Sequence, residues 1–241
     1  MSTSSSFIAH LIELRTRLMH SMIALLLVFL CLFPWAAELY ALLAHPLLAK
    51  LPAGGQMIAT DVTTPFFVPL KVTMMAAFLI ALPYILYQAW RFVAPGLYEH
   101  EKRLVVPLIV ASTLLFFCGM SFAYFAVFPV VFGFITAAAP EGVAVMTDIE
   151  KYLSFVLSMS MAFGIAFQMP VAVILLVRMG IVSIEKLREA RSYVVVGAFV
   201  VGAIFTPPDV VSQFMLAVPL WLLYELGIVV SSWTGRAETS R

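Results

Sequence analysis

The sequence contains few charged residues. Asp, Glu, Lys and Arg make up 11% of its 241 residues and hydrophobic residues make up 63%, whereas about a quarter of a soluble domain is charged. This composition excludes an ordinary soluble enzyme and indicates that lipid is the main solvent of the chain. The formal net charge of +1 also excludes bulk electrostatic attraction to nucleic acid.

Cysteine is scarce as well. Cys31 and Cys118 both lie inside apolar runs, where a small buried side chain is a more common role than a disulfide or a metal ligand. We therefore predict no metal site and no cofactor. The first six residues are polar and lack the basic start and apolar core of a secretory signal, so no cleavable signal peptide is predicted.

Long gaps between charged residues divide the chain into apolar segments. About 20 apolar residues cross the hydrocarbon core of a bilayer, which is roughly 30 Å thick. The gaps predict an all-α, polytopic integral membrane protein that forms a single membrane domain over 1–241. Its six expected transmembrane helices are 19–41, 68–90, 104–128, 153–177, 192–206 and 210–231. Tandem prolines at 207 and 208 predict a tight turn between the last two.

The distribution of Lys and Arg predicts the orientation of these helices. If the amino end is cytoplasmic, only Lys50, Lys71 and Lys151 of the 14 Lys and Arg residues fall on the far side. Lys and Arg concentrate in cytoplasmic loops of membrane proteins. We therefore expect both termini to be cytoplasmic.

Two stretches on the predicted cytoplasmic side combine acidic and apolar residues. In 7–18, Phe7, Leu11, Leu14 and Leu18 recur at helical spacing and predict an amphipathic interfacial helix. Such a helix is more often a membrane anchor than a binding site. A carboxylate gains nothing from an anionic membrane surface, so Glu13 within it suggests a cationic partner.

Two alternatives stay open for these stretches. Arg17, four residues after Glu13, is itself a possible partner of that carboxylate. The second stretch, 91–103, places Glu99 and Glu101 close to Phe92, but most charge runs of this kind are only solvated surfaces.

Four segments together resemble the TatC family. They are the helix motif at 10–18, the outer segment beginning at 58–61 and continuing through Pro65 and Phe66, the Phe-x-Ala-Pro-Gly-Leu-Tyr-x-x-Glu loop at 92–101, and the Thr-Pro-Pro-Asp turn at 206–209. The resemblance covers essentially the whole chain, and the four segments occur in order on the predicted sides of the membrane. It implies the multispanning core of the bacterial twin-arginine translocase, a non-enzymatic subunit of the cytoplasmic (inner) membrane.

The resemblance also implies partners and a binding site. The partners are paired-arginine signal peptides of folded precursors, the single-span subunits TatA and TatB, membrane lipid, and further copies in the complex. The acids that match Glu13 and Glu101 meet the two arginines of the signal. The implied signal-peptide site comprises Glu13, Arg15, Arg17, Leu18, Phe92 and Glu101.

Polar residues elsewhere are implied as partner-helix or structural sites. They are Pro46, Asp61, Tyr124, Gln168, Asp209 and Gln213. Gln213 matches a helix-six position associated, with helix five, with docking of the partner helices. Gln168 departs from the glutamate usual in the family. Asp61 and Asp209 are read first as caps or turns.

Two other function classes compete with this reading. A six-span secondary transporter of small solutes is the main alternative, but it predicts inverted repeats and a broken-helix site near the midplane, and no repeat symmetry is evident in the sequence. An intramembrane protease needs a nucleophile and a base at one depth. The four histidines, His10, His20, His45 and His100, all lie outside the expected spans or at their edges.

Overall fold

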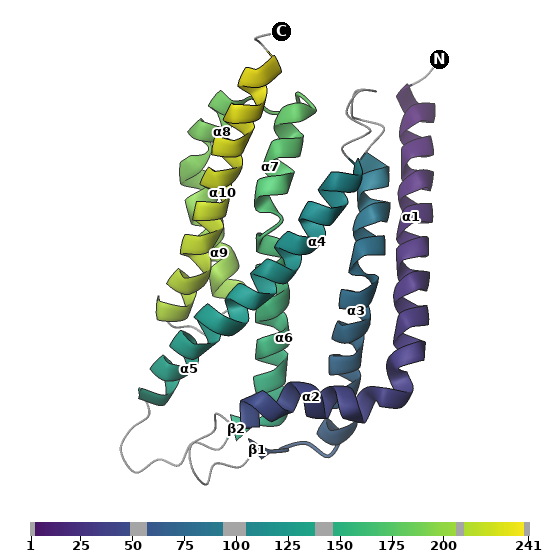
Figure 1. Cartoon of the computed structure of the whole chain (residues 1–241), viewed down its shortest axis with the longest axis vertical. Helices are drawn as coiled ribbons and strands as arrows, with labels where there is room; N and C mark the ends of the chain where they lie inside the picture. Colours follow the sequence, from purple (N-terminus) through teal and green to yellow (C-terminus); the bar gives the residue numbers. More distant parts are fainter. Residues whose placement is uncertain (1–2, 49–56, 94–104, 138–146, 206–209, 239–241) are drawn as a thin grey trace. The chain divides into compact units, whose positions relative to one another are not determined.

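The computed structural model describes residues 3–48, 57–93, 105–137, 147–205 and 210–238, which form helices, the short turns that join some of them, and one two-residue strand pair (Figure 1). The elements in chain order are α1 (Thr3–Leu32), η1 (Phe33–Trp35), α2 (Ala36–Leu48), β1 (Met57–Ile58), α3 (Thr64–Val93), α4 (Val105–Phe122), the π-helical η4 (Ala123–Val127), α5 (Phe128–Ala137), β2 (Thr147–Asp148), α6 (Ile149–Ala166), α7 (Met169–Arg178), α8 (Ile184–Glu189), α9 (Arg191–Phe205) and α10 (Val210–Glu238).

The predicted fold class is confirmed. In the part of the chain that the structure describes, five helical stretches are long and apolar enough to cross a membrane, and α9 is a shorter apolar helix of 15 residues. The protein is therefore an all-α, multi-pass membrane protein whose helices accommodate six spans. The single domain and the exact span limits stay predictions.

The amino-terminal segment differs from the expected interfacial helix followed by a span. Residues 7–18 are the early part of one continuous helix, α1. That helix ends at η1, where Pro34 supplies no N–H for the helical ladder. The chain turns there, and α2 runs crosswise to α1 (Figure 1).

The third stretch also continues beyond its expected end near Phe128. A proline ring clashes with the carbonyl four residues earlier, which for Pro129 is that of Phe125. The five residues before Phe128 form the π-helical turn η4, and α5 then continues to Ala137. Wider turns of this kind relieve such a clash, so Pro129 does not end the helix.

Contacts between residues divide the chain into two compact units. The first comprises 1–110 and 146–153, and the second comprises 111–145 and 154–241. In the first unit, α1 and α2 both pack against α3. Val68 and Leu153 form a buried cluster there, and Tyr40 and Leu43 of α2 pack on it. β1 pairs in parallel with β2 and joins the residues before α3 to those before α6.

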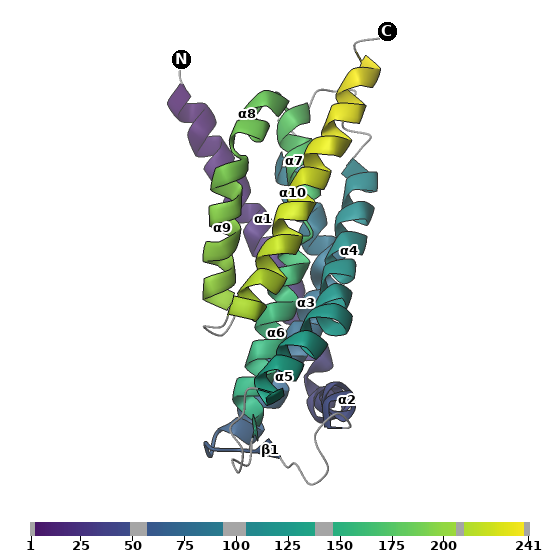
Figure 2. The same ribbon diagram turned by 90° about the vertical axis from the view of Figure 1, so that its left-hand side faces the viewer.

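In the second unit, α10 packs against α7 and α9 (Figure 2). With 15 residues, α9 is about half as long as α10, which has 29. Val173, Leu187, Tyr224 and Ile228 form its buried cluster. Glycines allow helices to approach closely here: a Cβ on Gly119 of α4 would lie 2.4 Å from the carbonyl oxygen of Phe163 on α6. Packing of small residues is the usual basis of helix association in lipid.

Candidate functional site

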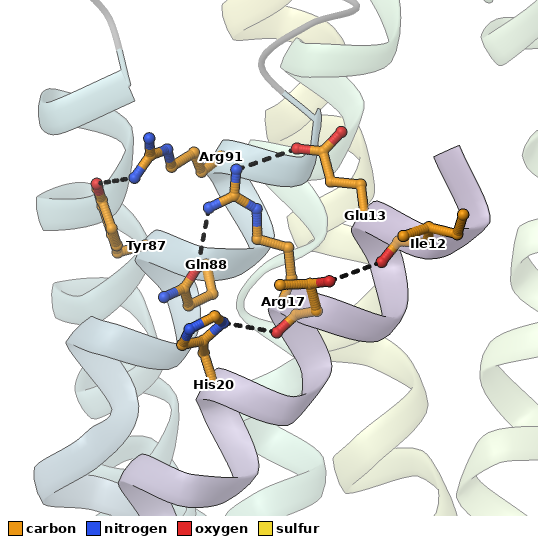
Figure 3. Close-up of polar contacts among 8 residues, drawn as sticks. Ile12, Glu13, Arg17, His20, Tyr87, Gln88 and Arg91 are labelled. Atoms are coloured by element: carbon orange, nitrogen blue, oxygen red, sulfur yellow. Dashed lines mark hydrogen bonds and ion pairs between the residues drawn. The ribbon is translucent and has the colours of Figure 1, made fainter. Parts of the chain in front are cut away.

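Glu13 lies in an ion pair on α1. The Arg17 guanidinium, one turn further along, donates from NH2 to Glu13 Oε1 at 3.0 Å (Figure 3). The side chains are 21% exposed for Arg17 and 33% exposed for Glu13. Both charged side chains of the pair are therefore partly buried. Among the residues that the structure describes, no donor reaches the second carboxylate oxygen, Oε2.

The same guanidinium ties α1 to α3. Arg17 NH1 donates to the amide oxygen of Gln88 at 3.2 Å, and the amide nitrogen of Gln88 donates to the Tyr84 hydroxyl at 2.7 Å (Figure 3). Gln88 is buried. The Arg17 guanidinium is therefore held at two points, by Glu13 and by Gln88. The Gln88 amide is in turn oriented by its bond to Tyr84.

Aromatic contacts flank this network. The His10 ring of α1 stacks on Phe92 near the end of α3, with 4.3 Å between ring centroids. On the same end of α3, Arg91 donates to the Tyr87 hydroxyl at 3.0 Å, so its charge is held away from Glu13 (Figure 3). Glu13 thus lies beside a partly apolar surface, where a charge-assisted hydrogen bond is stronger than in bulk water.

A second polar cluster lies in the first unit, at the Thr64 end of α3. Glu150, in the first turn of α6, accepts from Lys71 Nζ at 2.6 Å and from the Thr64 hydroxyl at 3.1 Å. Asp61 caps the turn before α3, since its side chain accepts from the backbone N–H of Thr63 at 3.1 Å. This is the kind of turn contact expected of Asp61.

Asp148, in β2, contributes a carboxylate to the same cluster. It accepts a short hydrogen bond from the Thr60 hydroxyl and another from the backbone N–H of Lys151. These bonds, that of Thr60 first, hold the pKa of Asp148 below its ordinary value. Asp148 is therefore a carboxylate at neutral pH.

Three polar side chains of the second unit bond to neighbouring helices. The Gln168 amide, at the break between α6 and α7, donates to the backbone carbonyl of Ser112 at 2.9 Å. The Gln213 amide of α10 donates to the carbonyl of Phe199 on α9 at 3.0 Å. Glu225 forms a two-bond pair with Arg191, with both N–O distances at 2.7 Å.

Residues 9–219 match the family described as Sec-independent protein translocase protein (TatC). The chain belongs to the TatC family. It is 57% identical over 224 residues to the TatC of Escherichia coli (strain K12), covering 93% of this chain and 87% of that protein. It is 41% identical over 231 residues to the TatC of Aquifex aeolicus (strain VF5), covering 95% of each.

A solved structure supports the same assignment. A crystal structure of the twin arginine translocase receptor TatC matches with a TM-score of 0.83 at 42% identity, covering 93% of this chain and 98% of that one. The chain is therefore a protein translocase component. Membership in this family argues against the two other function classes considered from the sequence, the small-solute transporter and the intramembrane protease.

The structure brings together part of the signal-peptide site that the TatC resemblance implies. Glu13 and Arg17 form one network, and Phe92 contacts α1 through His10. Arg15 and Leu18 are exposed on α1. Glu101 lies outside the described residues, so its distance from Glu13 is a matter for proposal.

The structure describes the surroundings of only some of the remaining implied residues. Tyr124 lies in η4, and its ring is nearly perpendicular to those of Phe125 and Phe128. Pro46 falls within α2, although its side chain is outside the described part. Asp209 is likewise outside it. In the described ranges, no three His, Cys, Asp or Glu side chains gather as a metal site would require.

Sequence reasoning did not identify the partners of Gln88 and Lys71. Both were recognisable as polar residues inside apolar runs, which is a signal of contact with protein or water. Their partners lie 71 and 79 positions away in the chain. No local spacing pattern reveals a contact of that kind.

Proposed function

We propose that this protein is the receptor subunit of the twin-arginine translocase, binding paired-arginine signal peptides at the cytoplasmic face through Glu13 and Glu101. The observation that carries the proposal is the partly buried Glu13 carboxylate, which has one oxygen without a donor among the described residues. An arginine fork matches a carboxylate with two parallel hydrogen bonds, and a lysine does not.

The location of the protein follows from the same proposal. It lies in the bacterial inner membrane with both termini in the cytoplasm, which is supported by the accumulation of Lys and Arg on the side of Glu13. A signal peptide made in the cytoplasm would then reach α1 without crossing the bilayer. Arg15, Leu18 and Phe92 would supply the surface around its arginines.

Removal of either carboxylate charge should weaken binding. In Glu13→Gln or Glu101→Gln, each charge-assisted hydrogen bond lost costs about 1.5 to 3 kcal/mol when partly desolvated, so we expect roughly 10- to 100-fold weaker binding. Photocrosslinking of a radiolabelled twin-arginine precursor to the full chain in membranes measures this effect. Insertion of the chain into the membrane should be unchanged.

Glu99→Gln is the matched control for that experiment, since it removes the same charge two positions from Glu101. We expect its adducts to equal those of the unaltered chain. Equal adducts from all three variants, or from a precursor whose arginine pair is replaced by lysines, would refute the receptor proposal.

We also propose that TatA and TatB dock on the edge formed by α9 and α10, in complexes that contain several copies of this chain. Support comes from the Gln213 contact and from Gly202 on α9, where a Cβ would lie 3.1 Å from the Gln213 side chain. Together these contacts fix how the two helices lie against each other.

Gln213→Leu should therefore weaken partner docking. Leucine cannot donate to the Phe199 carbonyl, so α9 and α10 should shift and crosslinks from α9 to TatA and TatB should fall several-fold. Val218→Leu, a change at an exposed position on α10, serves as the control. Crosslinks that persist at full yield in Gln213→Leu would argue against this edge as the docking site.

A further inference from the structure

The Glu13 carboxylate already holds a guanidinium. Arg17 NH2 lies 3.0 Å from Glu13 Oε1, which is the kind of contact that an arginine of a signal peptide would make. Arg17 is also retained by Gln88 of α3, at 3.2 Å from its other terminal nitrogen (Figure 3). The chain thus places one of its own arginines where the proposed function places a foreign one.

We infer that Arg17 is an internal competitor that masks Glu13, so that a signal peptide binds by exchange of one arginine for another. This inference rests on the proposed function, because it concerns the regulation of the same carboxylate. Arg17 lowers the affinity of the receptor for its signal, and a bound signal can be released when Arg17 returns.

The charge balance gives the competition its direction. With Arg17 in place the Glu13–Arg17 pair carries no net charge, so an incoming cation is attracted less strongly than it would be to a lone carboxylate. Two-bond binding of a new guanidinium uses both carboxylate oxygens, so the newcomer must share Oε1 with Arg17 or displace it. A signal arginine therefore gains less than its full interaction with the carboxylate.

Gln88 makes the exchange feasible. It is buried, and its orientation is fixed by the bond to Tyr84. When Arg17 leaves Glu13, the bond from its NH1 to Gln88 can persist, so the displaced guanidinium keeps a hydrogen-bond partner on α3. Leaving a partly buried charge without any partner would cost far more.

The test measures binding of a fluorescent paired-arginine peptide to the full chain in lipid nanodiscs at two salt concentrations. We expect Arg17→Gln to bind about tenfold more tightly than the unaltered chain, and with a steeper dependence on salt, because the carboxylate is no longer neutralised. In Glu13→Gln combined with Arg17→Gln, the gain from removing Arg17 should vanish, because its target is absent.

Two variants separate charge masking from altered folding or a general field effect. Arg17→Lys keeps a positive charge four residues after Glu13, where a Glu–Lys pair also forms, and should bind within about twofold of the unaltered chain. Arg91→Gln removes a cation that pairs with Tyr87 instead of Glu13, and it should likewise bind within about twofold, because exposed charges that are not in contact are strongly screened.

The outcomes also distinguish this inference from the proposal beneath it. If Glu13→Gln weakens binding but Arg17→Gln binds equally or less tightly, the competitor role is wrong and the receptor proposal stands. If Glu13→Gln has no effect on binding, the receptor site is itself misplaced and the competitor role falls with it. A tenfold gain that survives in the double variant would also overturn masking of Glu13.

Discussion

Gly119→Val should strongly destabilise the protein. Any side chain at residue 119 places a Cβ 2.4 Å from the Phe163 carbonyl oxygen and 2.9 Å from the Phe167 ring. The carbonyl belongs to the α6 backbone and cannot rotate away, so α4 and α6 must separate. Overpacking of this kind costs about 3 kcal/mol, and we expect the unfolding temperature in detergent to fall by roughly 10 °C.

Gly197→Ala is the matched control. Gly197 lies inside α9, and a Cβ there meets nothing within 4 Å. Alanine also favours a helix over glycine by about 1 kcal/mol. Its unfolding temperature should equal or exceed that of the unaltered chain. A Gly119→Val protein that unfolds at the same temperature would show that α4 and α6 are further apart than described.

Phe163→Ala should cause a loss at least as large, by the opposite change to the same helix contact. Phe163 is fully buried, with its ring 5.6 Å from that of Phe122 between centroids. Truncation leaves a cavity at the α4–α6 contact, and Phe→Ala changes in tight cores cost about 3 to 5 kcal/mol. The loss is one of packing, because lipid tails are as apolar as the side chain removed.

Phe125→Ala removes the same atoms from a side chain that is 76% exposed and contacts the Tyr124 ring. Its cost should stay below about 1.5 kcal/mol, the value of an aromatic pair. Thermal unfolding, measured as the loss of the monodisperse elution peak after heating, ranks the stabilities of the two variants. An equal loss in both would mean that burial at residue 163 contributes nothing to stability.

The composition and the gaps between charges were sufficient to predict the fold class. A helix in lipid must satisfy its own backbone hydrogen bonds, so a long apolar run has little choice of structure. Proline was a less reliable guide. Pro34 does end α1, whereas Pro129 lies within a continuing helix because the preceding π-helical turn makes room for its ring. Helical spacing within 7–18 likewise could not show that α1 continues without a break.

The candidate site was predictable in its residue types and not in its connections. Spacing alone indicated that Arg17 could pair with Glu13, because residues four apart share a helix face. The bond from Arg17 to Gln88 depends on how α1 packs along α3, which no local pattern determines. Glu225 illustrates the same point, since its partner, Arg191, begins a different helix 34 positions earlier.

The cluster around Glu150 has a consequence for the order in which the protein is made. Lys71 and Thr64 both donate to the Glu150 carboxylate, which lies 79 and 86 positions further along the chain. The ribosome therefore completes α3 before it has synthesised the acidic partner of that helix. The Thr64 end of α3 reaches its final set of contacts only after the first turn of α6 emerges, so this helix matures late although it is translated early.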